Sequence, residues 1–314
     1  MTVTAPQTAG TSTRAPAQAA RRRRRAMGLR PPVWFVLPAV LLYVAVVFLP
    51  NIQGLLYSFT DWDGFGTTWN WVGVANFGSV FADPNSMRAI GNTFLLTLVV
   101  TLGQNIVGLL LALGLNARIK SKYILRLVFF LPVVLTPIVA GYLWKYLLTP
   151  GGSLNSALEG MGLGFLRQDW LGDPDLVIYA ICVAIIWQGA GYSMVIYLAG
   201  LQAVPAEALE AAAIDGAGAI RRTISIVIPL INGSIVVNML LSVIGNLKQF
   251  DTVFSMTEGG PGSASETMAT IVYKTAFTYL RYPNALAQGV ILTVLVGVIA
   301  FVQFRLTQRK GALA

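Results

Sequence analysis

Two sets of uncharged polar residues stand out within long apolar stretches of the chain. One set has the i, i+3, i+4, i+7 spacing of a single helix face and consists of Ser242, Gly245, Asn246 and Gln249. The other is weaker and consists of Ile185, Gln188, Gly189 and Tyr192. Amides and hydroxyls donate and accept hydrogen bonds without charge, and an aromatic ring stacks on a sugar ring. Both faces therefore suit the binding of a neutral polyol, and neither is expected to face lipid.

Small and amide residues also hold membrane helices together through close approach and interhelical hydrogen bonds. Substrate lining and helix packing thus compete as explanations for both faces. We assign four residues of another stretch to helix packing, namely Gly103, Gln104, Asn105 and Gly108. We expect four prolines to kink or end helices: Pro38, Pro132, Pro137 and Pro229.

The chain offers little for catalysis. It has no histidine and one cysteine, Cys182, which excludes an internal disulfide and a histidine proton relay. No phosphate-binding loop, dinucleotide fingerprint or nucleophile–base pair is recognisable, so we predict no enzyme activity, no cofactor and no metal. The middles of the apolar stretches also lack Asp, Glu, Lys and Arg, which argues against an ion-coupled carrier. Active transport would therefore take its energy from a partner protein.

A short polar segment separates two of the apolar stretches. Pro205 suits the first turn of a helix, and Glu207 and Glu210 complement the helix dipole near that end. We predict a helix from about Pro205 to Ile214, a glycine turn, and re-entry into the membrane before Pro229. The resulting helix-turn-helix lies at the cytoplasmic surface. It either docks a partner or is an interfacial loop without one.

Six charge-poor stretches must position these residues, and each is long enough to cross about 30 Å of hydrocarbon as a helix. They are Val33 to Leu56, Thr93 to Leu115, Leu127 to Trp144, Leu176 to Leu201, Thr223 to Leu247 and Tyr282 to Phe304. Their residues lack the alternation of barrel strands. The predicted fold class is an all-α membrane protein with six transmembrane helices.

The basic residues predict the orientation, because Lys and Arg near helix ends are retained on the cytoplasmic side. The tract Arg21 to Arg25 precedes the first span, and its position favours anionic lipid over nucleic acid as its partner. We expect a multi-pass protein of the bacterial cytoplasmic (inner) membrane with both termini cytoplasmic. Residues 1–30 form a disordered basic tail, 31–310 the transmembrane domain, and 311–314 a C-terminal tail.

The outer segments contain tryptophans of the kind that form an interfacial belt: Trp62, Trp69, Trp71 and Trp170. The turn Gly259-Gly260-Pro261 is expected to shape an outer loop, since Gly and Pro there set the backbone conformation.

The polar segment resembles the EAA loop of permease subunits of bacterial binding-protein-dependent ABC importers. The matching residues are Glu210-Ala211-Ala212, Asp215-Gly216-Ala217 and Ile226-Val227-Ile228-Pro229, where only Ile228 replaces the leucine of the family. The flanks are similar to the maltose-type, carbohydrate-importing branch, through Trp187, Gly191-Tyr192-Ser193-Met194, Leu201-Gln202-Ala203-Val204-Pro205 and the stretch Phe250 to Pro261. The resemblance covers about Val33 to Lys310.

The resemblance implies the type I importer permease fold, with a coupling loop at about 202–229 that sits in a groove of the ATPase subunit. The residues that it assigns to ATPase coupling are Glu207, Glu210, Ala211, Ala212, Asp215, Gly216 and Ala217. Those that it assigns to the substrate pathway are Gln188, Gly189, Tyr192, Ser242, Gly245, Asn246 and Gln249. Ile185, Gln188 and Gly245 differ in type from the corresponding residues of the maltose subunit. The resemblance therefore does not imply which sugar this chain binds.

The implied function is ATP-driven import of a mono-, di- or oligosaccharide by alternating access. The implied partners are a second homologous permease in a heterodimer, an ABC ATPase dimer that hydrolyses the ATP, an extracytoplasmic solute-binding protein and the lipid bilayer, with no nucleic acid. A polyol phosphate is a further substrate class, although the uncharged faces argue against it. The alternatives are a passive sugar or polyol channel regulated through the same loop, and a membrane scaffold without a transported substrate.

Overall fold

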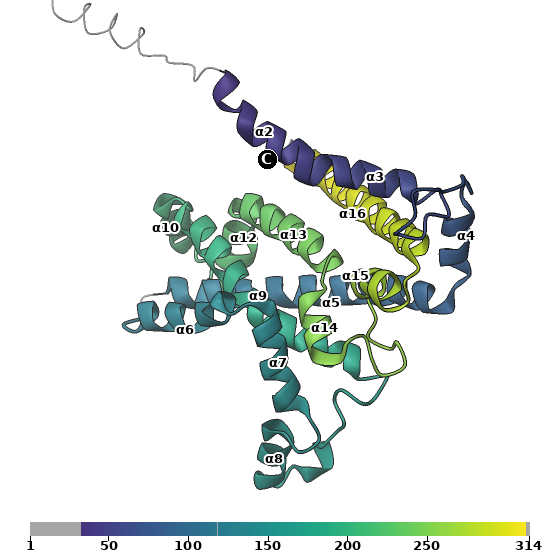
Figure 1. Ribbon diagram of the computed structural model, residues 1–314. Coiled ribbons are helices and arrows are strands. Elements are labelled where there is room, and N and C mark those ends of the chain that lie inside the picture. Colours follow the sequence, from purple (N-terminus) through teal and green to yellow (C-terminus); the bar gives the residue numbers. More distant parts are fainter. Residues whose placement is uncertain (1–32, 118, 312–314) are drawn as a thin grey trace, which may run out of the picture. The chain divides into compact units, whose positions relative to one another are not determined.

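The computed structural model describes residues 33–117 and 119–311, which form helices joined by loops (Figure 1). The predicted basic tail, residues 1–30, lies outside the described residues, as do residues 312–314 at the other end. The chain divides into two compact units, one ending at Gly54 and the other beginning at Leu55.

The first unit consists of successive helical segments that continue one another. They are η1 (Val33–Phe35), α2 (Leu37–Tyr43), the π-helical turn η2 (Val44–Phe48) and most of α3 (Leu49–Tyr57). Pro38 lies in the first turn of α2, where its missing N–H costs no hydrogen bond, so it begins this helix.

The second unit holds the remaining helices. They are α4 (Ala75–Ala82), α5 (Pro84–Asn116), α6 (Lys122–Val134), α7 (Pro137–Leu148), α8 (Ser153–Gly160), η3 (Gly164–Leu166), α9 (Val177–Gln202), α10 (Ala206–Ile214), α11 (Ala219–Arg222), η4 (Thr223–Val227), α12 (Ile228–Leu230), α13 (Asn232–Leu247), α14 (Asp251–Thr257), α15 (Met268–Tyr273), η5 (Lys274–Thr278) and α16 (Tyr282–Gly311).

The membrane spans agree with the prediction of an all-α protein. Four segments are long and apolar enough to cross a bilayer, and they are Leu37–Tyr57, Pro84–Asn116, Val177–Gln202 and Tyr282–Leu306. Two bent helix pairs raise the number to six when each pair counts as one span. The second span begins nine residues before the predicted Thr93, because the Asp83 side chain caps its first turn by accepting from the backbone N–H groups of Asn85 and Ser86.

The third and fifth predicted spans are broken. Segments Lys122–Val134 and Pro137–Gly160 meet at 98°, and Ala219–Leu230 and Asn232–Leu247 meet at 70°. In the third span the break falls just before Pro137, since the residue that precedes a proline avoids the helical conformation. Pro132 and Pro229, by contrast, lie inside α6 and α12, close to where these helices end.

Helices α5 and α9 lie side by side and form the centre of the second unit (Figure 1). Gly103 and Gly108 allow this close approach. A Cβ at Gly103 would lie 2.4 Å from Ile186 Cδ1, and one at Gly108 would lie 2.5 Å from Ser193 Cβ and 2.9 Å from the Met194 backbone nitrogen. The predicted packing role of these two glycines is confirmed, as small residues are what membrane helices use for close contact.

Replacement of Gly108 by alanine should therefore destabilise the protein. The added methyl group meets main-chain atoms of α9, which cannot move aside, and overpacking of this kind costs about 1–3 kcal/mol. The measurement is the thermal unfolding midpoint of the purified protein in detergent.

Gly91→Ala is the matched control, because it places the same methyl group on the same helix with no atom within 4 Å. This variant should keep or slightly raise the midpoint, since alanine favours helix over glycine by about 1 kcal/mol. Equal midpoints for both variants would contradict the proposed packing of α5 on α9.

Candidate functional site

All seven residues assigned to the substrate pathway line one cavity of about 320 Å³. They come from α9 (Gln188, Gly189, Tyr192), from α13 (Ser242, Gly245, Asn246) and from Gln249. Gln249 was expected on the helix face, but α13 ends at Leu247, so it lies on the turn that follows. The remaining lining residues are Gln104, Val133, Leu135, Pro137, Ile185 and Leu241.

The break between α6 and α7 supplies one wall of the cavity. A broken helix leaves main-chain carbonyls without an intrahelical partner, and inside a bilayer these need another donor. Gln188 Nε2 on α9 donates to the Leu135 carbonyl at 2.9 Å. The same side chain therefore lines the cavity and stabilises the bend.

Two of the predicted lining residues also hold α13 against α5. Ser242 Oγ accepts from Asn105 Nδ2 at 3.2 Å, and Asn246 Nδ2 donates to Thr101 Oγ1 at 3.0 Å. Both side chains are buried. Ser242 and Asn246 therefore have both roles, since they line the cavity and also pack α13 against α5.

Asn105 forms the centre of this buried polar network. Its Oδ1 accepts from Asn238 Nδ2 of α13 at 2.8 Å and from the Tyr197 hydroxyl of α9. Its Nδ2 also donates to the Thr101 carbonyl at 2.7 Å. The packing role predicted for Asn105 is confirmed.

Gln104 has a second role that the sequence analysis missed. It was assigned to helix packing, yet its amide lines the cavity. A Cβ at Gly189 would lie 2.3 Å from Gln104 Oε1, so the glycine leaves space for this amide. The signal was present in the sequence, because Thr97, Thr101 and Gln104 follow i, i+4, i+7 and mark a polar face on α5.

The remaining lining groups differ in how firmly they are held. Gln249 Nε2 donates to Thr252 Oγ1 at 2.9 Å, while the Gln249 carbonyl accepts from Thr267 Oγ1 at 3.1 Å. Tyr192 and Gly245 are exposed. The cavity in this single chain is therefore open on the side where these two residues lie.

The segment between α9 and α13 forms the predicted helix-turn-helix, with α10 beginning at Ala206, one residue later than expected. Asp215 caps its C-terminus, and Gly216 follows with φ 75°. The turn is closed by two backbone bonds, Gly216 N–H to the Ala213 carbonyl at 3.1 Å and Ala217 N–H to the Ala212 carbonyl at 2.9 Å. Gly216 is thus required for its left-handed conformation.

Most of the residues assigned to coupling lie on the surface of this turn. Glu207, Glu210, Ala211, Asp215 and Gly216 are exposed, Ala217 is half-buried and Ala212 is buried. The sequence analysis missed two exposed isoleucines beside them, Ile214 at 87% and Ile220 at 77% exposure. These side chains add an apolar surface to an acidic helix.

The base of this turn is anchored in an apolar cluster at the C-terminal end of α5. The cluster contains Leu115 of α5, Leu201 of α9 and Val227 of η4, with Val204 and Leu209 packed against it. Helix α9 therefore connects the cavity directly to the exposed turn, and the chain returns from the turn into α13.

Comparisons with known proteins agree with this architecture. Residues 104–310 match the family model described as "Binding-protein-dependent transport system inner membrane component". The multiple sugar-binding transport system permease protein MsmF of Streptococcus mutans is 32% identical over 88% of this chain and 94% of its own length. The diacetylchitobiose uptake system permease protein NgcF of Streptomyces coelicolor is 33% identical over 97% and 91%. The sn-glycerol-3-phosphate transport system permease protein UgpA of Agrobacterium fabrum is 33% identical over 89% and 95%.

A solved structure shares the fold. A chain of a bacterial ABC transporter that imports the acidic polysaccharide alginate superimposes with a TM-score of 0.79 at 23% identity, covering 93% of this chain and 99% of that one. The family match, the relatives and the apolar spans lead to one conclusion. The chain belongs to the binding-protein-dependent transport system inner membrane components and is a multi-pass permease of the inner membrane.

Proposed function

We propose that this permease is a subunit of an ATP-driven importer that moves a sugar into the cytoplasm by alternating access. The observation that carries the proposal is the cavity, in which seven uncharged residues from two helices and a turn face one space of about 320 Å³. Amide and hydroxyl groups there match the hydroxyls of a sugar, and the Tyr192 ring offers a surface for stacking.

The lining of the cavity also favours a neutral sugar over a phosphorylated one. Among the relatives, MsmF and NgcF are named for sugars and UgpA for glycerol 3-phosphate. A phosphate group is usually recognised by Arg or Lys, and neither residue type is among the described residues that line this cavity. A neutral mono-, di- or oligosaccharide is therefore the substrate that the cavity favours.

A second, homologous permease would complete the cavity. Tyr192 and Gly245 are exposed in the single chain although they line this space, so another chain is needed to enclose a sugar. We infer a heterodimer with the translocation path between its two subunits. An extracytoplasmic binding protein would deliver the sugar. In support, a bacterial alginate ABC transporter of similar fold has been crystallised in complex with a periplasmic protein that holds an alginate pentasaccharide.

The exposed turn between α9 and α13 would dock the ATPase, which alone hydrolyses ATP. Ile214 and Ile220 supply apolar contacts, while Glu207 and Glu210 add charges at the start of the helix. Such docking would put the turn and both termini in the cytoplasm, and Arg221 and Arg222 beside the turn support this orientation. Closure of an ATPase dimer would move the two turns and, through α9 and α13, the cavity walls.

The experiment that tests the proposal is uptake into proteoliposomes. They contain this chain, a homologous partner permease, the ATPase and the binding protein, with ATP trapped inside and labelled sugars outside. Uptake that needs both ATP and the binding protein supports the importer. Equilibration of the sugar without either would support a passive facilitator instead.

Tyr192→Leu should lower the rate of sugar uptake about tenfold, because the aromatic stacking surface in the cavity is lost. Tyr179→Leu is the control. It lies on the same helix with nearly the same exposure, but it does not line the cavity, so uptake should stay at the wild-type rate. Equal losses in the two variants would remove Tyr192 from the pathway.

Gly216→Val should lower ATP-driven uptake about tenfold, since a β-branched residue is strained at φ 75° and the turn would change shape. Gly218→Val is the control, because this glycine has φ −64° and equally open space around it. A co-purification assay should show loss of the ATPase from the first variant only. Retention by both would argue against docking on this turn.

A further inference from the structure

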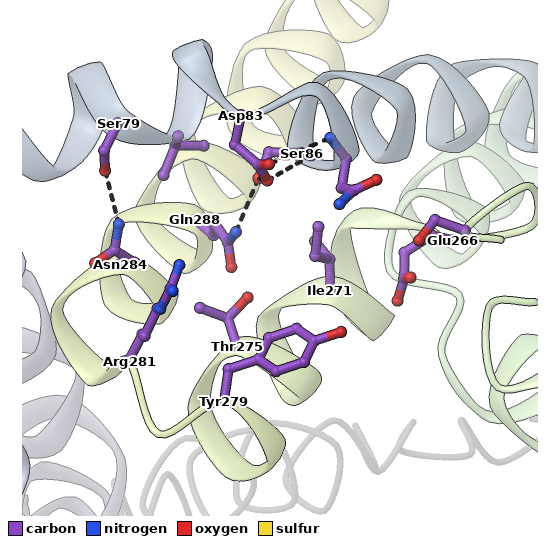
Figure 2. Close-up of a pocket in the computed structure, with 13 residues that line it drawn as sticks. Ser79, Asp83, Ser86, Glu266, Ile271, Thr275, Tyr279, Arg281, Asn284 and Gln288 are labelled. Atoms are coloured by element: carbon purple, nitrogen blue, oxygen red, sulfur yellow. Dashed lines mark hydrogen bonds between the residues drawn. The ribbon is translucent and has the colours of Figure 1, made fainter.

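A second polar pocket, of about 490 Å³, lies between the start of α5, the end of α15 with η5, and the start of α16 (Figure 2). Its walls include Ser86, Glu266, Tyr279, Arg281, Asn284 and Gln288. None of these residues lines the cavity described above. The volume falls within the usual range for small-molecule sites, about 300–1,000 Å³.

The pocket lies at the opposite end of α5 from the docking turn. Ser86 is in the first turn of α5, whereas Leu115, in the last turn, packs in the cluster that anchors the docking turn. A helix of 33 residues is about 50 Å long, enough to cross the bilayer. If the docking turn is cytoplasmic, this pocket opens on the outer face, where a sugar would arrive.

The amide of Gln288 is fixed so that its oxygen lacks a partner. Asp83 Oδ2 accepts from the Ser86 hydroxyl at 2.7 Å, which leaves Ser86 Oγ to accept from Gln288 Nε2 at 3.0 Å. Gln288 is 3% exposed, and its Oε1 has no hydrogen-bond partner among the described residues. Rotating the amide would set two acceptors against each other, so this orientation is enforced.

Glu266 offers a second unpartnered acceptor. It is 2% exposed, with Oε2 bound to Lys274 Nζ at 3.2 Å and Oε1 without a partner in the described part of the chain. Gly259, at φ 85°, leaves room for it, because a Cβ there would lie 2.9 Å from Glu266 Oε1. Asn92 Nδ2 donates a hydrogen bond to the backbone carbonyl of Glu266 at 2.9 Å. The Gly259-Gly260-Pro261 turn thus accommodates a buried carboxylate.

A buried acceptor without a donor costs about 1–3 kcal/mol, so the Gln288 oxygen at this pocket calls for a ligand that donates a hydrogen bond. Arg281 is exposed on the same pocket and offers donors, and Tyr279, 59% exposed, offers an aromatic face. Hydroxyl groups satisfy both kinds of partner, whereas a phosphate would face the Glu266 carboxylate. We propose that this pocket is a second carbohydrate-binding site, for a neutral sugar on the outer face of the permease.

This inference rests on the proposed function, and the structure links the two sites. Thr267, next to Glu266, donates its hydroxyl to the carbonyl of Gln249, which lines the first cavity. Thr267 and Thr270 also form a reciprocal cap that fixes the start of α15. A sugar bound in this pocket would therefore lie beside a rigid segment that contacts the cavity wall.

The test is saturation-transfer NMR on the permease heterodimer with its ATPase in lipid nanodiscs. The probes are D-glucose, maltose, N-acetylglucosamine and glycerol 3-phosphate. For at least one neutral sugar, Gln288→Leu and Tyr279→Leu should each weaken binding about tenfold, through a lost acceptor and a lost stacking surface. Tyr279 is exposed, so its variant is expected to fold even where Gln288→Leu does not.

A control variant locates the binding. Tyr146→Leu removes a tyrosine that is 74% exposed and lines neither site, so it should retain the signal that Gln288→Leu and Tyr279→Leu weaken. Binding of glycerol 3-phosphate alone would overturn the assignment to neutral sugars.

The outcomes also separate this site from the importer itself. The first outcome is that the wild-type complex takes up sugar with ATP and that Gln288→Leu and Tyr279→Leu bind sugar as strongly as the wild type in the NMR experiment. This result would reject the outer site and keep the importer. Weaker sugar contacts in both variants, without any ATP-driven uptake by the wild type, would support the site and reject the importer. Unchanged sugar contacts with weaker attachment of the binding protein would show that a partner side chain fills the pocket, which also overturns the proposal.

Discussion

The side chain of Asn105 on α5 bonds to Tyr197 on α9 and to Asn238 and Ser242 on α13, and these contacts fix the three helices around one point. Apolar side chains give membrane helices little preference for one register, because lipid is as apolar as they are. A buried amide does favour one register, since sliding a helix would leave the hydrogen-bond partners of the amide unpaired. The cavity depends on this network, as Ser242 belongs to both.

The sequence was sufficient for features governed by the bilayer itself. Long apolar stretches must become helices, and uncharged polar residues at helical spacing must avoid lipid, so the spans and the two cavity faces could be predicted. The prolines also indicated where helices bend or end, but the 98° angle at Pro137 could not be predicted, because the Leu135 carbonyl freed there is paired by Gln188 from a distant helix. The double role of Gln104 was hidden for a similar reason, as its amide lies against Gly189 of α9. The second pocket joins Ser86, Glu266 and Gln288 from three separate segments, and no local sequence pattern indicates that these residues meet.

The same helices that line the cavity also carry the exposed turn between α9 and α13. Helix α9 runs from Gln188 to the cluster around Leu201, and the chain returns through Val227 of the π-helical η4 into α13. Between them lie only short helices and one glycine turn. Movement of that turn would therefore reach one cavity wall through unbroken α9 and the other through the bent segments that lead into α13, while the Asn105 network keeps both walls attached to α5.

The residues that line the cavity contain no carboxylate, lysine, arginine or histidine. Their hydrogen-bonding side chains include amides and a serine hydroxyl, and groups of these two types do not titrate between acid and neutral pH. The wall that this chain contributes to the cavity should thus present the same electrostatic surface in acid and in neutral surroundings. Any acid sensitivity of this chain would then originate outside the cavity, at charged side chains of its loops and surface turns.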